Sequence, residues 1–161
     1  MIKCIEYNGN KQILIRFIEE LQDFLIEIDP LKRLRRLPDY WKIYTNNLLK
    51  KINRYNGKIY IAEYKNIPIG MIAGIIEQFS KEDETECIPS KPARILELIV
   101  SEAYRGKNIW SLLMNEIEKH FQKENCDIVR IEVFEPNKKT HGFYEKHGYQ
   151  DRAIEMVKKI S

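Results

Sequence analysis

Residues 95–100, Ile-Leu-Glu-Leu-Ile-Val, are apolar at five of six positions. A run of this length is typical of a central β-strand that is buried on both faces of a sheet. A polar turn follows over residues 101–108, and apolar residues then repeat at helical spacing over 109–121. The sequence therefore predicts a buried strand whose end leads, through a short turn, into the N-terminus of a helix.

Patterning also predicts the other elements of the chain. The expected elements are a strand over 2–7, helices over 11–28 and 38–52, a hairpin of strands over 59–64 and 67–79, a polar loop over 80–92, a strand over 127–134, a helix over 138–147 and a last strand over 149–160. The hairpin implies antiparallel pairing in the first half, and the helices between later strands imply parallel pairing in the second. We expect an α/β fold with one mixed sheet and helices on both faces. Its order is β-α-α-β-β-β-α-β-α-β, in a single three-layer domain over residues 1–161.

Composition excludes several classes of protein. The 27 basic residues exceed the 24 acidic ones by a net charge of only +3, which does not indicate a nucleic-acid partner. No apolar run reaches the roughly 18 residues of a membrane-spanning helix, and the N-terminus does not resemble a signal peptide. The 3 cysteines are widely spaced and form no CxxC motif, so we expect reduced thiols and a cytoplasmic protein. The 3 histidines lack metal-ligand spacing, so we expect no metal.

The turn Arg105-Gly106-Lys107-Asn108 is a candidate anion site. The first backbone N–H groups of a helix have no partner within the helix, and the helix dipole adds positive potential there. Arg105 and Lys107 place further positive charge beside them. The turn therefore predicts a phosphate or pyrophosphate ligand, and an ordinary basic turn is the alternative.

Two motifs carry a family resemblance. Residues 100–107, Val-Ser-Glu-Ala-Tyr-Arg-Gly-Lys, resemble the acetyl-CoA-binding signature of the GNAT superfamily of N-acetyltransferases. Asn137, followed by Phe-Tyr-Glu-Lys-His-Gly-Tyr over 143–149, resembles the downstream motif of the same family. The two motifs occur in the family's order, with a predicted strand between them, and with the strand at 95–100 they cover about a third of the chain.

The resemblance implies where acetyl-CoA binds. The pantetheine arm would pair with the backbone of a strand that splays from its neighbour, and the pyrophosphate would lie on the turn and the start of the next helix. The implied binding residues are Leu98, Ile99, Val100, Arg105, Gly106, Lys107, Asn108, Ile109, Trp110, Asn137 and Tyr144. Asn137 either bonds the amides of the donor or caps the short helix. The chain departs from the signature at Asn108 and Trp110, where the family has small residues. This departure leaves weak binding of acetyl-CoA, a different acyl group and lost activity open.

Glu97 and Tyr144 are the expected catalytic residues. Glu97 is the one charged residue in the apolar strand, and burial of an unpaired carboxylate is costly. It therefore lines a cleft, pairs with an arginine such as Arg94 or Arg130, or is protonated. In a cleft it would act as general base toward an amine. Tyr144 matches the family tyrosine near the thioester sulfur, which implies a general acid toward the thiolate; an aromatic residue packed under the helix is the alternative.

The leading hypothesis is transfer of an acetyl group from acetyl-CoA to a primary amine of a small molecule or protein, by direct attack in a ternary complex. One alternative is a non-catalytic GNAT-like module that binds a CoA ester or a partner protein. Another is a nucleotide-binding domain, although GxxxxGK[ST] and GxGxxG are both missing. The basic run 32–36 and the acidic run 82–86 give opposite indications of the acceptor's charge. We expect no nucleic-acid or membrane partner and leave a homodimer open.

Overall fold

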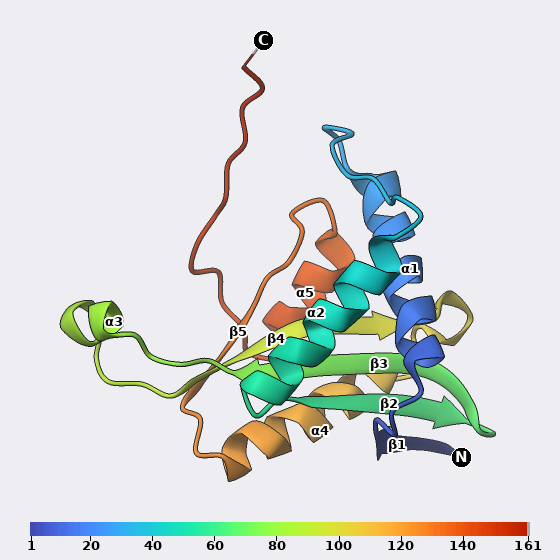
Figure 1. Cartoon of the computed structure of the whole chain (residues 1–161), viewed down its shortest axis with the longest axis horizontal. Helices are drawn as coiled ribbons and strands as arrows, with labels where there is room; N and C mark the ends of the chain where they lie inside the picture. Colours follow the sequence, from blue (N-terminus) through green and yellow to red (C-terminus); the bar gives the residue numbers. More distant parts are fainter. Residues whose placement is uncertain (161) are drawn as a thin grey trace.

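One mixed sheet with the strand order β1-β2-β3-β4-β5 runs through the molecule (Figure 1). Its strands are β1 (Ile2–Glu6), β2 (Lys58–Tyr64), β3 (Ile67–Ile76), β4 (Pro92–Val100) and β5 (Ile128–Ile131). Neighbouring strands are antiparallel except β4 and β5, which are parallel. The computed structural model describes residues 1–160, and Ser161, the last residue of the expected domain, lies outside the described residues. The predicted mixed α/β sheet is confirmed.

Helices cover both faces of this sheet (Figure 1). The helices are α1 (Lys11–Ile28), α2 (Tyr40–Arg54), α3 (Lys81–Glu86), α4 (Ile109–Lys123) and α5 (Lys138–Lys146), with a 3₁₀ turn η1 (Glu102–Tyr104) before α4. Apolar side chains of α1 and α2 form one core against the sheet, and those of α4 and α5 form a second core on the opposite face. None of these helices, within residues 1–160, is long and apolar enough to cross a membrane.

Local chemistry explains where α1 begins and ends. The side chain of Asn10 accepts a hydrogen bond from the backbone N–H of Gln12 at 3.1 Å, which satisfies one of the free donors of the first turn. Asp29 ends the helix because Pro30 disfavours the helical conformation in the residue before it. The buried carboxylate of Asp29 then accepts backbone N–H groups of residues 31, 33 and 34, which fixes the connection toward α2.

The strands β4 and β5 separate part of the way along the sheet. Their pairing covers only Pro92 to Ile95 of β4 and Ile128 to Ile131 of β5. In the described part of the chain, residues 97–100 of β4 pair with β3 alone. The open side of β4 leaves backbone groups that a bound molecule can pair with. This separation creates the space in which the candidate site lies.

Several predicted boundaries are wrong. The helix expected from Pro38 begins at Tyr40, with Asp39 at its N-cap position. The strand expected to reach Phe79 ends at Ile76. The strand expected over 127–134 covers only 128–131, because β4 has turned away and offers no further partner.

The sequence predicts a polar loop over residues 80–92, but part of this segment is helical. Ser80 and Asp83 form a capping box, in which each side chain accepts a hydrogen bond from the other's backbone N–H, and α3 follows. The Ser-x-x-Asp spacing was a readable signal for this helix. The extra helix changes the predicted element order between the third and fourth strands.

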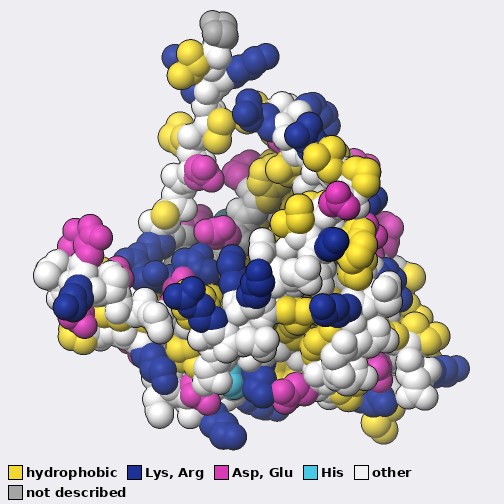
Figure 2. All heavy atoms as spheres, viewed as in Figure 1, with side chains coloured by type: hydrophobic (Ala, Val, Ile, Leu, Met, Phe, Trp, Pro, Cys, Tyr) yellow, Lys and Arg dark blue, Asp and Glu magenta, His cyan; other side chains and the backbone are white. Residues whose placement is uncertain are grey.

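The predicted last strand over 149–160 is wrong as well. Residues 150–160 adopt no helix or strand and extend away from the sheet (Figure 1). Their apolar side chains are exposed (Figure 2), with Ile154 at 79% and Met156 at 90%. A strand needs a neighbouring strand to satisfy its backbone groups, and this segment has none within the described chain. The element order therefore ends with α5.

Candidate active site

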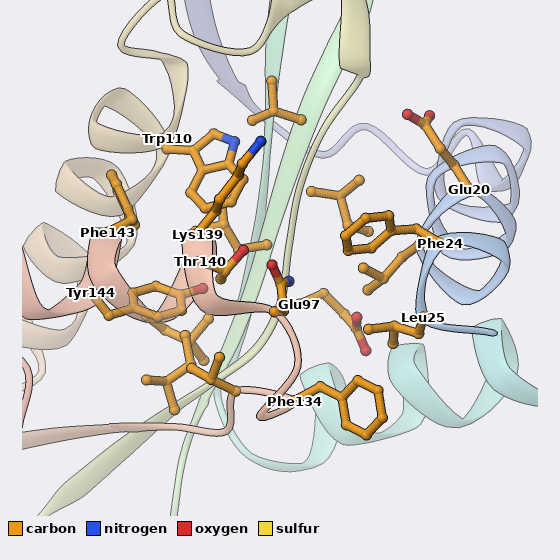
Figure 3. A pocket seen from close by; sticks show the side chains of 18 of the residues that line it. Glu20, Phe24, Leu25, Glu97, Trp110, Phe134, Lys139, Thr140, Phe143 and Tyr144 are labelled. Carbon is orange, nitrogen blue, oxygen red and sulfur yellow. The ribbon is translucent and has the colours of Figure 1, made fainter. Parts of the chain in front are cut away.

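A cavity of about 680 Å³ opens where β4 separates from β5. Helices α1 and α2 form one wall, and α5 with the first turn of α4 forms the opposite wall (Figure 3). The cavity brings together most of the predicted site residues, namely Glu97, Leu98, Ile99, Val100, Arg105, Gly106, Asn108, Ile109, Trp110, Asn137 and Tyr144. Lys107 is the predicted residue that does not line it.

The turn before α4 forms the positively charged end of this cavity. Gly106 (φ +77°) and Asn108 (φ +59°) both adopt the left-handed conformation, which glycine and asparagine tolerate best. The Nε of Arg105 donates to the carbonyl of Val100 at 3.1 Å. The Lys107 ammonium lies 5.0 Å from the Tyr104 ring centroid. Asparagine at position 108 therefore reproduces the backbone shape that a glycine would give, and Arg105 is the cation of this turn that faces the cavity.

Trp110, the second departure from the family signature, packs against α5. Its ring meets that of Phe143 edge to face, with centroids 4.9 Å apart and planes at 84°. The side chain is half-buried and also lines the cavity (Figure 3). The large residue thus joins the two helices of one cavity wall.

Glu97 lies in the middle of the cavity. Its side chain is only 6% exposed, and Oε1 accepts a hydrogen bond from the hydroxyl of Tyr44 on α2. Burial raises the pKa of the Glu97 carboxyl to about 7, although the Tyr44 hydrogen bond lowers it. Arg94 and Arg130 contact Glu77 instead, at 2.5 Å and 3.5 Å. The predicted alternative, an arginine partner for Glu97, does not occur with either residue.

Tyr144 faces the same cavity from α5, with its hydroxyl directed into the open space (Figure 3). The residue is 4% exposed and is flanked by the rings of Phe143 and Tyr149. Burial, and then the charge of Glu97, raise the pKa of the Tyr144 phenol. The phenol therefore keeps its proton at neutral pH and can donate a hydrogen bond to a group bound in the cavity.

Asn137 occupies the N-cap position of α5, yet its side chain makes no capping hydrogen bond. Because Asn137 lines the cavity, its amide can contact a bound molecule there. The sequence predicts that Asn137 either bonds the amides of the donor or caps the short helix, and the capping hydrogen bond is missing from the structure. A contact with the donor stays a prediction.

Sequence reasoning missed the tyrosines of α2. Tyr40 and Tyr44 are four residues apart, on one helix face, with ring centroids at 5.3 Å. Both line the cavity, and burial raises the pKa of Tyr40 to about 12 and that of Tyr44 further. The i, i+4 tyrosine pair was visible in the sequence, but its contact with Glu97 was not, because 53 residues separate Tyr44 from Glu97.

The arrangement suits proton transfer at a bound ligand. A carboxyl that titrates near neutrality and a phenol that stays protonated face one cavity, whose end is a helix N-terminus with a cation. Within residues 1–160, no group of three or more histidine, cysteine, aspartate or glutamate side chains could hold a metal ion.

Comparison with known proteins places this chain in a family. Residues 16–149 match the model of the acetyltransferase (GNAT) family. The match covers more than half of the chain, and the chain belongs to the GNAT family of acetyltransferases. Membership implies transfer of an acyl group from an acyl-CoA.

Individual relatives agree with this assignment. An uncharacterized N-acetyltransferase of Methanocaldococcus jannaschii is 26% identical in an alignment of 106 positions, which covers 63% of this chain and 45% of that protein. The match therefore spans less than half of that relative's length.

Solved structures share the fold. A GCN5-related N-acetyltransferase from Ralstonia eutropha superposes with a TM-score of 0.73 at 19% identity, covering 99% of both chains. A predicted acetyltransferase from Clostridium acetobutylicum, solved with acetyl-CoA, gives 0.74 at 17% identity, with 99% and 96% covered. A tetramutant of a Bacillus halodurans protein gives 0.82 at 13% identity, with 98% and 99% covered.

Proposed function

We propose that this protein transfers an acetyl group from acetyl-CoA to a primary amine, by direct attack in a ternary complex. The observation that carries the proposal is the placement of Glu97 and Tyr144 on one cavity, between a helix N-terminus and the wall formed by α1 and α2. Family membership supports the acyl-CoA donor, and the site geometry supports the roles of the two residues.

The donor would lie along the open side of β4. Backbone groups of residues 98–100 that do not face β3 are open to the amides of the pantetheine arm, except the Val100 carbonyl, which accepts the hydrogen bond from Arg105 Nε. The N–H groups of the first turn of α4 and the guanidinium of Arg105 would hold the pyrophosphate. Asn137, on the opposite wall, can bond a pantetheine amide. This orientation directs the thioester toward Glu97 and Tyr144.

The two catalytic side chains would act at the two ends of the reacting group. The amine nitrogen attacks the thioester carbonyl carbon, forms the C–N bond and loses a proton to the Glu97 carboxylate. The C–S bond then breaks, and Tyr144 donates a hydrogen bond to the sulfur that receives the electron pair. One proton leaves the nitrogen and one proton is taken up by the thiolate, so the overall reaction neither consumes nor releases a proton. Burial raises the pKa of Glu97 to about 7, so its carboxylate form is accessible near neutral pH and can accept this proton.

Acetyl-CoA turnover with a panel of primary amines tests the proposal. We expect amine-dependent release of free thiol, and a loss of about 10²- to 10⁴-fold in kcat for Glu97→Gln. A protein that binds CoA by calorimetry but turns over no amine would instead be the non-catalytic module.

The three cysteines are all free in the described chain, which supports our placement of the reaction in the cytoplasm.

A further inference from the structure

The cavity continues past Glu97, away from the N-terminus of α4. We call this part the distal chamber and define it by Leu25 of α1, Tyr40 and Tyr44 of α2, and Phe134 after β5, all of which line the cavity. Figure 3 shows Glu97 between the Trp110 end of the cavity and the side chains of Leu25 and Phe134. The Glu97 carboxyl therefore lies at the boundary between the proposed donor site and the chamber.

The distal chamber is apolar and aromatic. Leu25 and Phe134 contribute only hydrocarbon. The Tyr40 hydroxyl is directed to Gln22 Oε1 at 3.2 Å, and that of Tyr44 is taken by Glu97. Both hydroxyl groups therefore already donate a hydrogen bond to a protein atom, and the tyrosines present their ring surfaces to a ligand. Such walls hold the apolar body of a ligand.

Charge is confined to one point of the chamber. The other acidic and basic residues that line the cavity are Glu20, Arg105, Glu132 and Lys139. Glu20 projects from α1 away from Glu97 (Figure 3), and Lys139 belongs to the first turn of α5. Arg105 belongs to the turn before α4, and the Glu132 side chain is 92% exposed. Among the described cavity-lining residues, Glu97 is thus the one carboxyl beside the chamber.

We infer that the acceptor is a primary monoamine with an alkyl or aromatic body, and that the chamber discriminates against diamines and polyamines. The inference rests on the proposed function. The amino group would meet Glu97, and its body would fill the chamber. A second ammonium at the far end of a short diamine would lie among partly buried apolar walls without a counter-ion, and desolvation of an unpaired charge is unfavourable.

A matched pair of acceptors tests this inference. Butylamine and 1,4-diaminobutane have the same chain length and differ in one charge. We expect kcat/KM for acetyl transfer to be at least about tenfold higher for butylamine. We expect 2-phenylethylamine to be accepted at least as well as butylamine. Equal or better use of 1,4-diaminobutane would overturn the acceptor class and leave the proposed acetyl transfer intact.

A second test changes the chamber itself. Leu25→Glu places a carboxylate where a second ammonium would lie, and Leu25→Gln is its neutral control of similar size. The ratio of kcat/KM for 1,4-diaminobutane to that for butylamine should rise at least about tenfold in Leu25→Glu and stay nearly constant in Leu25→Gln. A ratio that Leu25→Glu leaves unchanged would place the acceptor elsewhere.

Binding measurements separate failure of the inference from failure of the proposed function. Calorimetry on the full chain saturated with CoA should show tighter binding of 2-phenylethylamine than of 1,4-diaminobutane, whether or not turnover occurs. If no amine consumes acetyl-CoA but this order of affinities holds, the proposed function is wrong and the chamber's preference stands. If the order is reversed, the inference is wrong regardless of activity.

Discussion

The hydroxyl of Tyr44 on α2 donates a hydrogen bond to Oε1 of Glu97 in β4, and this contact joins the first half of the chain to the strand that carries the proposed base. Burial raises the pKa of Glu97, whereas the Tyr44 hydrogen bond and then the charge of Lys51 lower it, with a balance at about 7. Tyr44 is therefore a positioning residue that also adjusts the proton affinity of the proposed base.

Tyr44→Phe should raise the pKa of Glu97 above its value of about 7, because the stabilising donor is lost while the ring still excludes water. Titration of the Glu97 carboxyl by ¹³C NMR measures this directly. Tyr40→Phe is the control: its hydroxyl bonds Gln22 at 3.2 Å, so removing it should shift Glu97 less. A pKa that falls or stays constant in Tyr44→Phe would contradict this account of the contact.

Glu97 should also make the stability of the protein depend on pH. Its pKa is about 7 in the folded state against an ordinary 4.5, so between these values the folded state holds a proton that the unfolded state has lost. The free energy of unfolding should therefore fall as pH rises through this window, by about 3 kcal/mol in total.

Glu97→Gln keeps a neutral acceptor for the Tyr44 hydroxyl and removes the titration. Urea unfolding at pH 4.5, 6 and 8 measures the free energy of unfolding of both proteins. As pH rises, this free energy should fall in the wild type but not in the variant, because only the wild type acquires a buried negative charge. A difference between the two proteins that is constant from pH 4.5 to 8 would show that Glu97 titrates normally.

The sequence was most informative where one local pattern decides the structure. The buried strand at 95–100, the turn before the helix that begins at Ile109 and the helix carrying Tyr144 are short-range features, and the structure has all three. The partner of Glu97 was unreadable, because the choice between Arg94, Arg130 and Tyr44 depends on how α2 packs on the sheet. The strand expected over 149–160 failed for a similar reason, since alternation of side chains does not supply a neighbouring strand.

The separation of β4 from β5 explains a second difference. Pairing of the two strands stops at Ile95 and Ile131, so the predicted strand to residue 134 loses its partner at the point where the cavity begins. Phe134 thereby enters the distal chamber instead of continuing the sheet. No local pattern marks that position, because the separation results from the packing of the whole sheet.

Arg105 and Lys107 should contribute unequally to CoA binding, although each adds one positive charge to the same turn. Arg105 lines the cavity, whereas the Lys107 ammonium lies over Tyr104 outside it. Arg105→Ala should weaken the Kd for CoA by about 10- to 100-fold, as expected for a lost charge-assisted hydrogen bond. Lys107→Ala should change it less than about threefold, through screened electrostatics alone. Calorimetry at two salt concentrations measures both, and equal losses would assign the phosphates to Lys107 as well.

Tyr144→Phe should lower kcat for acetyl transfer by about 10²-fold or more, because the variant keeps the ring and loses the donor to the departing sulfur. KM for acetyl-CoA and the melting temperature should change little, since the ring still packs between Phe143 and Tyr149. Tyr149→Phe is the matched control from the same aromatic cluster. Its hydroxyl donates to Glu118 at 3.2 Å, and the residue does not line the cavity. Steady-state kinetics should therefore show normal kcat for Tyr149→Phe. Full kcat in Tyr144→Phe, or an equal loss in the control, would make Tyr144 a packing residue.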